Sequence, residues 1–138
     1  MAEEHKLEAQ VLTPEGEVFS GELQMLSTRT STGEVGILAR HVPMIARLVP
    51  AELRLHKSDS EVETYAQGEG WLEVFANRAR VLIAEAIPPD QLYASELKSR
   101  LDEAKQRLDE AEEDSAAAEQ AQRECARAEA FIQIAENR

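Results

Sequence analysis

Three histidines and one cysteine are the side chains best suited to catalysis or metal binding: His5, His41, His56 and Cys125. No two histidines have the spacing of a metal-ligand pair, and no histidine lies close to the cysteine in the sequence. Since a zinc site gathers three or four such ligands, the sequence predicts no metal centre and no other cofactor. His41 has two interpretations, a general base or a turn histidine that bonds locally or contacts a partner.

The glycines and serines do not form the loops that bind phosphate or present a nucleophile. Gly33 and Gly36 bracket two residues, without the G-x-G-x-x-G or G-K-[ST] pattern. Ser20-Gly21 and residues 31–33 lack the pattern of a nucleophile elbow. The many acidic residues are dispersed, which is typical of a solvated surface. The sequence therefore predicts no catalytic site, and an enzyme stays an alternative that turnover by the purified chain would favour.

The charge of the chain restricts its partners. Its 138 residues carry a formal net charge of −12. Nucleic acids and anionic membrane surfaces need clustered Lys and Arg, so neither is expected to bind, whereas protein partners are favoured. The longest run of Leu, Ile, Val and Ala is 81–84, so no membrane insertion is predicted. Residues 1–4, Met-Ala-Glu-Glu, carry two acidic side chains and no apolar segment, so no signal peptide is expected. A single cysteine cannot form an internal disulfide and favours a reducing, intracellular location.

Chain-breaking residues divide the sequence near Pro88-Pro89. All six glycines lie at or before Gly70, and all five prolines lie at or before Pro89. Both residue types interrupt regular structure, so their absence from the remainder indicates long helices. Two domains are expected, residues 1–89 and residues 90–138.

Short alternating segments in the first domain predict β-strands. Turn residues such as Thr13-Pro14-Glu15-Gly16 separate these segments, which favours an all-β sandwich or barrel. Residues 31–45 are too broken for a helix, with Ile37 and Leu38 expected to be buried and 40–43 expected to form a turn. The strands are predicted within 7–11, 18–19, 23–27, 53–55, 62–65, 71–75 and 80–84.

Two heptad seams in the second domain predict an antiparallel helical hairpin. Asp114-Ser115 interrupts them, and either residue could cap the second helix. An alanine contributes about 0.8 kcal/mol on burial and a leucine about 1.5–3, so the alanine-rich second seam predicts a hairpin that is held partly by docking elsewhere and could undock. The seams are Leu97, Leu101, Ala104, Leu108 and Ala111, then Ala118, Ala121, Cys125, Ala128, Ile132 and Ala135.

Two arginines one helical turn apart give the second helix a candidate binding surface. Arg123 and Arg127 could pair locally with Glu119 and Glu124, or meet an acidic partner surface when the hairpin moves. Exposed pairs contribute about 0–1 kcal/mol, so local pairing would oppose such a movement weakly. Cys125 lies on the seam and is expected to be a small core residue.

Several segments, in order, resemble the epsilon subunit of the F-type ATP synthase, which is called delta in mitochondria. The stretch 33–45, GEVGILARHVPMI, resembles the family signature Gly-Glu-[Leu/Val]-Gly-Ile-Leu, two variable positions, then His-Ala-Pro-Leu. A helical tail without glycine follows, as in the family. The other matching segments are VLTPEGEVFSGE (11–22), PAELRL (50–55), GWLEV (70–74) and RVLIAEAI (80–87).

The resemblance implies a mainly β plus α chain, with an N-terminal ten-stranded β-sandwich followed by a C-terminal antiparallel α-helical hairpin. It implies a non-catalytic rotor subunit that binds the gamma subunit and the c-ring and couples proton flow to ATP synthesis. The hairpin would contact the alpha/beta head transiently and inhibit ATP hydrolysis. The expected location is peripheral, on the cytoplasmic face of the bacterial inner membrane. A free-standing binding module with a coiled-coil arm is the alternative.

The resemblance also assigns the residues of the 31–45 stretch. Glu34 would face the polar loops of the c-ring, and His41 would lie at the gamma-facing edge, beside Arg40 and Pro43. Ala39-Arg40 stands where the family usually has Pro-Gly or Pro-Asn, which removes a turn former and adds a cation.

Two further departures affect packing and ligand binding. Glu69 replaces the first glycine of the family's Gly-Gly-Phe-Leu-Glu-Val, and Trp71 replaces its aromatic residue. Some bacterial members bind ATP through Ile/Leu-Asp-x-x-Arg-Ala, and here Tyr93 and Glu96 replace the Asp and the Arg. Because a carboxylate repels phosphate, no ATP binding below millimolar concentration is expected.

Overall fold

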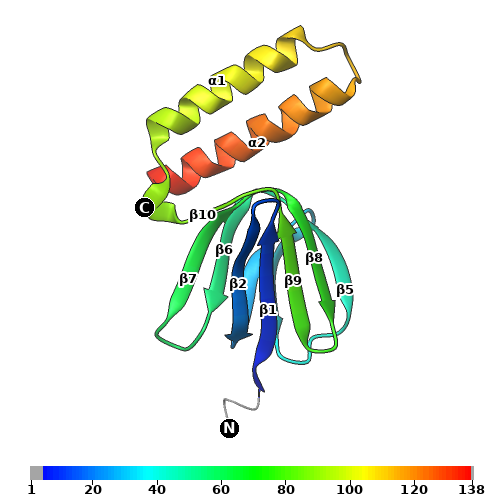
Figure 1. The fold of residues 1–138 in the computed structure, drawn as a ribbon, viewed down its shortest axis with the longest axis vertical. Coiled ribbons are helices and arrows are strands. Elements are labelled where there is room, and N and C mark those ends of the chain that lie inside the picture. Colours follow the sequence, from blue (N-terminus) through cyan, green and yellow to red (C-terminus); the bar gives the residue numbers. More distant parts are fainter. Residues whose placement is uncertain (1–4, 138) are drawn as a thin grey trace. The chain divides into compact units, whose positions relative to one another are not determined.

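The computed structural model describes residues 5–137, and the chain divides into two compact units, residues 1–88 and 89–138 (Figure 1). Pro89 falls in the second unit, where it begins a short 3₁₀ turn, η2 (Pro89–Gln91). Residues 1–4, on which the expectation of no signal peptide depends, lie outside the described residues.

The first unit is a ten-stranded β-sandwich, which confirms the expected fold class. The pattern of residues indicates seven of these segments. It misses the two strands between Gly33 and Leu48, where glycines and a proline interrupt the alternation, and the two-residue strand Ala86–Ile87. The strands are β1 (Leu7–Thr13), β2 (Gly16–Leu23), β3 (Met25–Thr30), β4 (Gly33–Leu38), β5 (Met44–Leu48), β6 (Ala51–His56), β7 (Val62–Gln67), β8 (Gly70–Phe75), β9 (Arg78–Ile83) and β10 (Ala86–Ile87).

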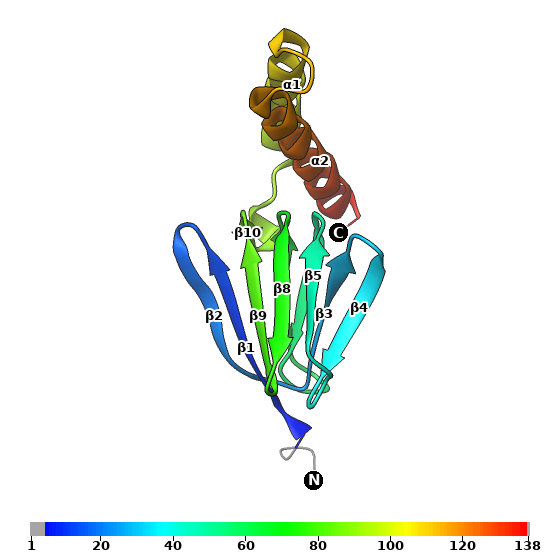
Figure 2. The same cartoon turned by 90° about the vertical axis from the view of Figure 1, so that its right-hand side faces the viewer.

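The strands pair in the order β10-β7-β6-β3-β5-β8-β9-β1-β2, and β4 pairs with β3. Figure 2 shows β2, β1, β9, β8 and β5 side by side. β3 meets β5 at the single pair Thr30 and Leu48, and this is where the sheet passes from one layer to the other. The pairs are antiparallel except for β1 and β9, which run parallel over Glu8–Leu12 and Arg78–Leu82.

Alternation along the strands places one set of apolar side chains between the layers. In β8, Leu72 and Val74 are buried, whereas Trp71 and Phe75 are exposed. Each buried Leu or Val contributes about 1.5–3 kcal/mol relative to an exposed one, so this core stabilises the unit. The core cluster is Leu7, Ala9, Val11, Leu23, Leu26, Ile37, Leu48, Leu53, Leu55, Leu72, Val74, Ala79, Val81 and Ile83.

A close backbone approach at the start of β8 requires one glycine. A Cβ on Gly70 would lie 1.9 Å from the carbonyl oxygen of Leu82, so no other residue fits there. Glu69 does not disturb this contact, because the Ala84 N–H donates to the Glu69 carbonyl at 2.9 Å and Gly70 pairs with Ile83. Of the two glycines in the family motif, this chain therefore keeps Gly70, the one that packing requires, and replaces the other with Glu69.

The second unit is an antiparallel helical hairpin of α1 (Ala94–Glu110) and α2 (Ala116–Glu136), as expected. Ser115 caps α2, because its side chain accepts from the Ala118 N–H at 3.1 Å, and Asp114 takes a left-handed φ of 62° before it. The buried residues of the two helices are Leu97, Ala104, Ala118, Ala121, Cys125, Ala128 and Phe131.

The seam of α2 differs from the predicted one at its C-terminal end. Phe131 is fully buried, whereas Ile132, which the heptad pattern had placed in the seam, is half-buried. An apolar stripe on a helix is wider than a strict heptad seam, so a large side chain in the adjacent position enters the core. No helix among residues 5–137 is long and apolar enough to span a lipid bilayer.

Candidate functional site

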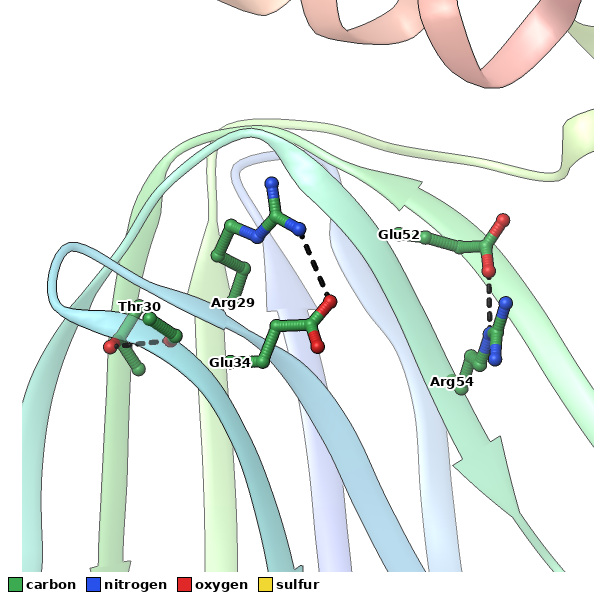
Figure 3. A network of polar contacts seen from close by, with 6 residues as sticks. Arg29, Thr30, Glu34, Glu52 and Arg54 are labelled. Atoms are coloured by element: carbon green, nitrogen blue, oxygen red, sulfur yellow. Dashed lines mark hydrogen bonds and ion pairs between the residues drawn. The ribbon is translucent and has the colours of Figure 1, made fainter. Parts of the chain in front are cut away.

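Glu34 lies on β4, which pairs with β3 along its whole length and stands outside the main strand order. Its carboxylate forms an ion pair of 3.1 Å with Arg29, directly opposite on β3 (Figure 3). Both side chains are largely exposed, at 79% for Glu34 and 55% for Arg29. Such a pair contributes about 0–1 kcal/mol, so Glu34 can exchange Arg29 for another cation at little cost.

Hydroxyl groups fix the turn between β3 and β4. The Thr30 hydroxyl donates to the Gly33 carbonyl at 2.9 Å and accepts from the Thr32 N–H at 3.2 Å. Gly33 has a φ of 136°, which favours glycine. Residues 33–38, expected only not to be helical, form an ordered strand. Ile37 is buried as expected, whereas Leu38 is 57% exposed because adjacent residues of a strand face opposite sides.

The chain turns between β4 and β5 at residues 39–43. Arg40 adopts a left-handed φ of 65°, so it occupies the conformation that a glycine or asparagine would adopt easily. The His41 N–H donates to the Leu38 carbonyl at 3.2 Å, and its Nδ1 lies 2.7 Å from the Val42 carbonyl oxygen. His41 therefore bonds locally, which favours the turn interpretation over the general base. Pro43 is exposed immediately before β5.

A cluster of exposed apolar residues covers the outer face of β5, β8 and β9, and sequence reasoning missed it. The register places Trp71 beside Leu82, and Ile45 opposite Glu73. We call this cluster the outer patch. The sequence of β8 could have indicated this surface, because the strand carries apolar residues on both of its faces. Its members are Ile45 (72% exposed), Trp71 (47%), Phe75 (66%) and Leu82 (43%) on these strands, together with Val42 (69%) in the turn that leads into β5.

Charged groups lie among and beside the apolar residues of the outer patch, since Glu73, opposite Ile45 and Arg80, stands between Trp71 and Phe75 on β8. The Arg47 guanidinium stacks over the Trp71 ring, 5.2 Å from its centroid, and this presents a cation at one side. Arg80 lies 3.9 Å from Glu73 across the strands. Arg78 pairs with Glu8 at 3.3 Å. A groove of about 430 Å³ borders the patch and is lined by Phe75 and these acidic and basic groups. Aromatic and arginine side chains together on one exposed surface are typical of a protein interface.

The hairpin residues Arg123 and Arg127 lie on α2, where Arg123 is exposed and Arg127 is half-buried. The Glu124 carboxylate, considered above as a local partner of these arginines, pairs with Arg107 of α1. Lys98 and Glu136 form a second pair between the helices at 3.8 Å. Both pairs join α1 to α2 at the surface.

The residues considered for catalysis do not converge. Within residues 5–137, no group of three or more His, Cys, Asp and Glu side chains is placed to hold a metal ion. Burial raises the pKa of the Cys125 thiol, which disfavours the reactive thiolate. Cys125 packs in the helical seam, where it fills space beside alanines.

The segment that replaces the ATP motif lies at the start of α1. Leu92 is buried and Tyr93 is 57% exposed, and the Tyr93 side chain makes no capping hydrogen bond to the helix. Glu96 occupies the first turn of α1, where it is exposed. A carboxylate at a helix N-terminus interacts favourably with the helix dipole. Glu96 therefore occupies the position where an anionic phosphate would otherwise be attracted.

Comparisons with known proteins agree with this architecture. The model of the ATP synthase delta/epsilon chain β-sandwich domain matches residues 6–89. The ATP synthase epsilon chain of Sulfurihydrogenibium sp. is 31% identical over 91% of this chain and 93% of its own length. Among solved structures, one chain of the Euglena gracilis mitochondrial ATP synthase, in an assembly with OSCP, F1 and the c-ring, has a TM-score of 0.74 at 19% identity. The match covers 96% of this chain and 82% of that one.

A chain from the central stalk and c-ring of the Tetrahymena thermophila mitochondrial ATP synthase has a TM-score of 0.62 at 15% identity, over 93% of this chain and 95% of that one. These structural matches show a shared fold, whereas the family match and the bacterial relative show descent. The chain therefore belongs to the ATP synthase delta/epsilon chain family and is a non-catalytic subunit of that complex.

Proposed function

We propose that this chain is a rotor subunit in the central stalk of a proton-translocating ATP synthase, where it couples rotation of the c-ring to ATP synthesis. The observation that supports this most is the outer patch, in which four large apolar side chains are exposed on one face of β5, β8 and β9 and Val42 is exposed in the turn before β5. A cluster of this kind on a water-soluble surface marks an interaction site, whereas single exposed apolar residues do not. Membership of the family points to a partner within the ATP synthase.

The gamma subunit is the proposed occupant of the outer patch. Val42 belongs to the patch and directly follows His41, so the patch is continuous with the turn that the resemblance assigns to gamma. Arg40, His41 and Pro43 would form its border at this end. Aromatic and arginine side chains dominate binding energy at interfaces, and Trp71 with Arg47 supplies both types.

The c-ring is the proposed partner of Glu34. The Glu34 carboxylate lies next to the turn between β3 and β4, on a strand that pairs with β3. Its ion pair with Arg29 is exposed. A basic loop of a c subunit could replace Arg29 without leaving a buried charge unpaired. By this interpretation the chain is peripheral, on the cytoplasmic face of a bacterial inner membrane.

The hairpin is the proposed regulatory part. Its buried residues include four alanines, and the ion pairs Lys98–Glu136 and Arg107–Glu124, which join its two helices, lie at the surface. Little free energy therefore opposes its rearrangement. Arg123 and Arg127 would contact the alpha/beta head in that rearranged state and inhibit hydrolysis. ATP is not proposed as the ligand that controls it, since Glu96 would repel phosphate, and calorimetry should detect no binding below millimolar ATP.

The experiment that tests this function measures binding of the purified gamma subunit to the tagged chain. Replacing Ile45 or Phe75 with Asp removes an apolar side chain of the outer patch and adds a carboxylate, and we expect affinity to fall by about a hundredfold. Val62→Asp is the matched control, because Val62 is 45% exposed on β7 and outside the outer patch. Equal losses in all three variants would contradict the proposed face.

The same experiment separates the alternative of a free-standing module. A wild-type chain that binds no gamma subunit, and that recovers no ATP synthase subunits from gently solubilised membranes, would contradict the rotor function. Recovery of gamma with the c-ring and the alpha/beta head would support it.

A further inference from the structure

Asn77 joins three segments that are distant in the sequence. Its Oδ1 accepts from the Arg40 N–H at 2.8 Å, and its Nδ2 donates to the Lys6 carbonyl at 2.9 Å. Its own carbonyl accepts from the Glu8 N–H at 3.2 Å. The turn between β4 and β5, the turn between β8 and β9 and the start of β1 thus meet at one amide side chain.

The backbone of Asn77 allows this role. Ala76 and Asn77 form the two-residue turn between β8 and β9, with φ values of 51° and 61°. Two successive left-handed residues define the turn that suits the twist of a β-hairpin, and asparagine is favoured there. The turn is tight, so the Asn77 side chain starts from a fixed backbone.

Arg40 is the residue that needs support. A left-handed φ of 65° is uncommon for a residue with a long side chain, and it persists where the surroundings enforce it. The hydrogen bond from its N–H to Asn77 fixes the peptide in that orientation. His41 and Val42 follow directly, and Val42 is 69% exposed as a member of the outer patch.

We propose that Asn77 is a positioning residue for the docking surface: its amide holds Arg40 in the left-handed conformation and thereby sets His41 and Val42 at the border of the outer patch. This inference rests on the proposed function, because the surface is the one assigned to the gamma subunit. Asn77 is not itself expected to contact gamma.

The first test replaces Asn77 with Gly, which keeps the left-handed turn and removes both side-chain hydrogen bonds. We expect the full-length chain to bind purified gamma about tenfold more weakly, while its melting temperature changes little. Asn77→Asp keeps the acceptor for the Arg40 N–H and loses the donor to Lys6, and should bind within about threefold of wild type. Ala76→Gly alters the same turn, makes no change to these bonds, and should not weaken binding.

The second test is a rescue that a merely structural role would not produce. Glycine adopts a φ of 65° without support, so in an Arg40→Gly background the change Asn77→Gly should weaken gamma binding by less than about twofold. In parallel, hydrogen exchange of the Arg40 amide should be about tenfold faster in Asn77→Gly than in wild type. Both results together would support the inference.

Other results would overturn it. If Asn77→Gly binds gamma as wild type does, or loses the same factor in the Arg40→Gly background, then Asn77 does not act through Arg40. If wild type itself fails to bind gamma, the proposed function fails and the positioning role falls with it. The wild-type measurement therefore distinguishes the two failures.

Discussion

The two units of this chain bury different kinds of side chain. The sandwich encloses a cluster dominated by Leu, Val and Ile, such as Leu72 and Val81. The hairpin encloses four alanines together with Leu97, Cys125 and Phe131. Because buried area determines hydrophobic stabilisation, the sandwich is expected to be the stable body and the hairpin the part that rearranges. The difference matches the proposed division into a docking unit and a regulatory hairpin within one short chain.

Removing the hairpin is the most drastic test of this comparison. A chain truncated after Pro89 should fold, bind gamma and assemble. The residues proposed to bind gamma and the residue proposed to bind the c-ring all lie in the sandwich. ATP hydrolysis by the assembled complex should rise, because the proposed inhibitory arm is absent. Unchanged hydrolysis in the truncated complex would show that this arm does not inhibit, and an unfolded truncation would show that the sandwich depends on it.

Within the sandwich, Leu72→Ala should give the largest loss of stability from a single substitution. Leu72 is fully buried in β8, and such a change costs about 2–5 kcal/mol through lost burial and a residual cavity. Leu82→Ala is the matched control, because Leu82 is 43% exposed on the neighbouring strand and should cost far less. Urea unfolding of both variants measures the difference, and equal losses would contradict the assigned core.

In the hairpin, the comparable test is smaller because the buried groups are smaller. Ala121→Gly should destabilise α2 by about 2 kcal/mol, of which about 1 is helix propensity and about 0.8 is the buried methyl group. Ala126→Gly, at an exposed site of the same helix, should show the propensity part alone. Native-state hydrogen exchange of the α2 amides reports both, and identical effects would mean that the alanine seam is not packed.

The cap of α2 should contribute about 1 kcal/mol. Ser115→Ala removes the oxygen that accepts from the Ala118 N–H at 3.1 Å, so the first turn of α2 should exchange faster. Ser99→Ala lies at an exposed position of α1 and should be neutral or slightly stabilising. A stable Ser115→Ala variant would indicate that Asp114 replaces it as the cap.

The smallest expected effect is a pH-dependent one on the sandwich surface. A hydrogen bond from Lys57, 2.7 Å away, lowers the pKa of Glu63, and the Tyr65 hydroxyl adds to this. A carboxyl whose pKa is lower in the folded state stabilises the protein at neutral pH and loses that effect as pH falls through the lowered value. Lys57→Met should therefore have a slightly lower melting temperature than wild type at pH 7.

That gap in melting temperature should close in acid, once Glu63 is protonated in both proteins. Glu61→Gln is the control, because it removes the longer contact of 3.8 Å to Lys57 and leaves the Glu63 pair in place. A gap that persists at acid pH would assign the effect to the Lys57 side chain packing over Phe19, 5.7 Å from its ring centroid, instead of to Glu63.

Local patterns predicted much of this fold. Alternation along β1 and β8 predicted strands, and the heptad spacing of Ala118, Ala121, Cys125 and Ala128 predicted the seam of α2. The ten-strand count came from the resemblance, since Gly33 and Gly36 disguised β4. Leu38 was misplaced because an apolar pair was assumed to be buried together, although adjacent residues of a strand face opposite sides.

The candidate site was less predictable because it depends on contacts between distant segments. The outer patch needs the register of β5, β8 and β9, which no short window of sequence contains. Asn77 is 37 residues from Arg40 and 71 from Lys6, so its role had no local signal. The Glu34 and His41 segment was singled out through its resemblance to a family signature, and Arg123 and Arg127 through their helical spacing; the roles of both sets stay predictions.

The parallel pairing of β1 with β9 has a consequence for how the chain acquires its structure. Contacts between residues so far apart in sequence raise the contact order and slow folding, because a long loop must close before they form. During synthesis β1 and β2 leave the ribosome early and must wait for β9 before the sandwich can close. The first strand is thus an exposed edge in the nascent chain, and this interval is when aggregation or chaperone binding is expected to compete with folding.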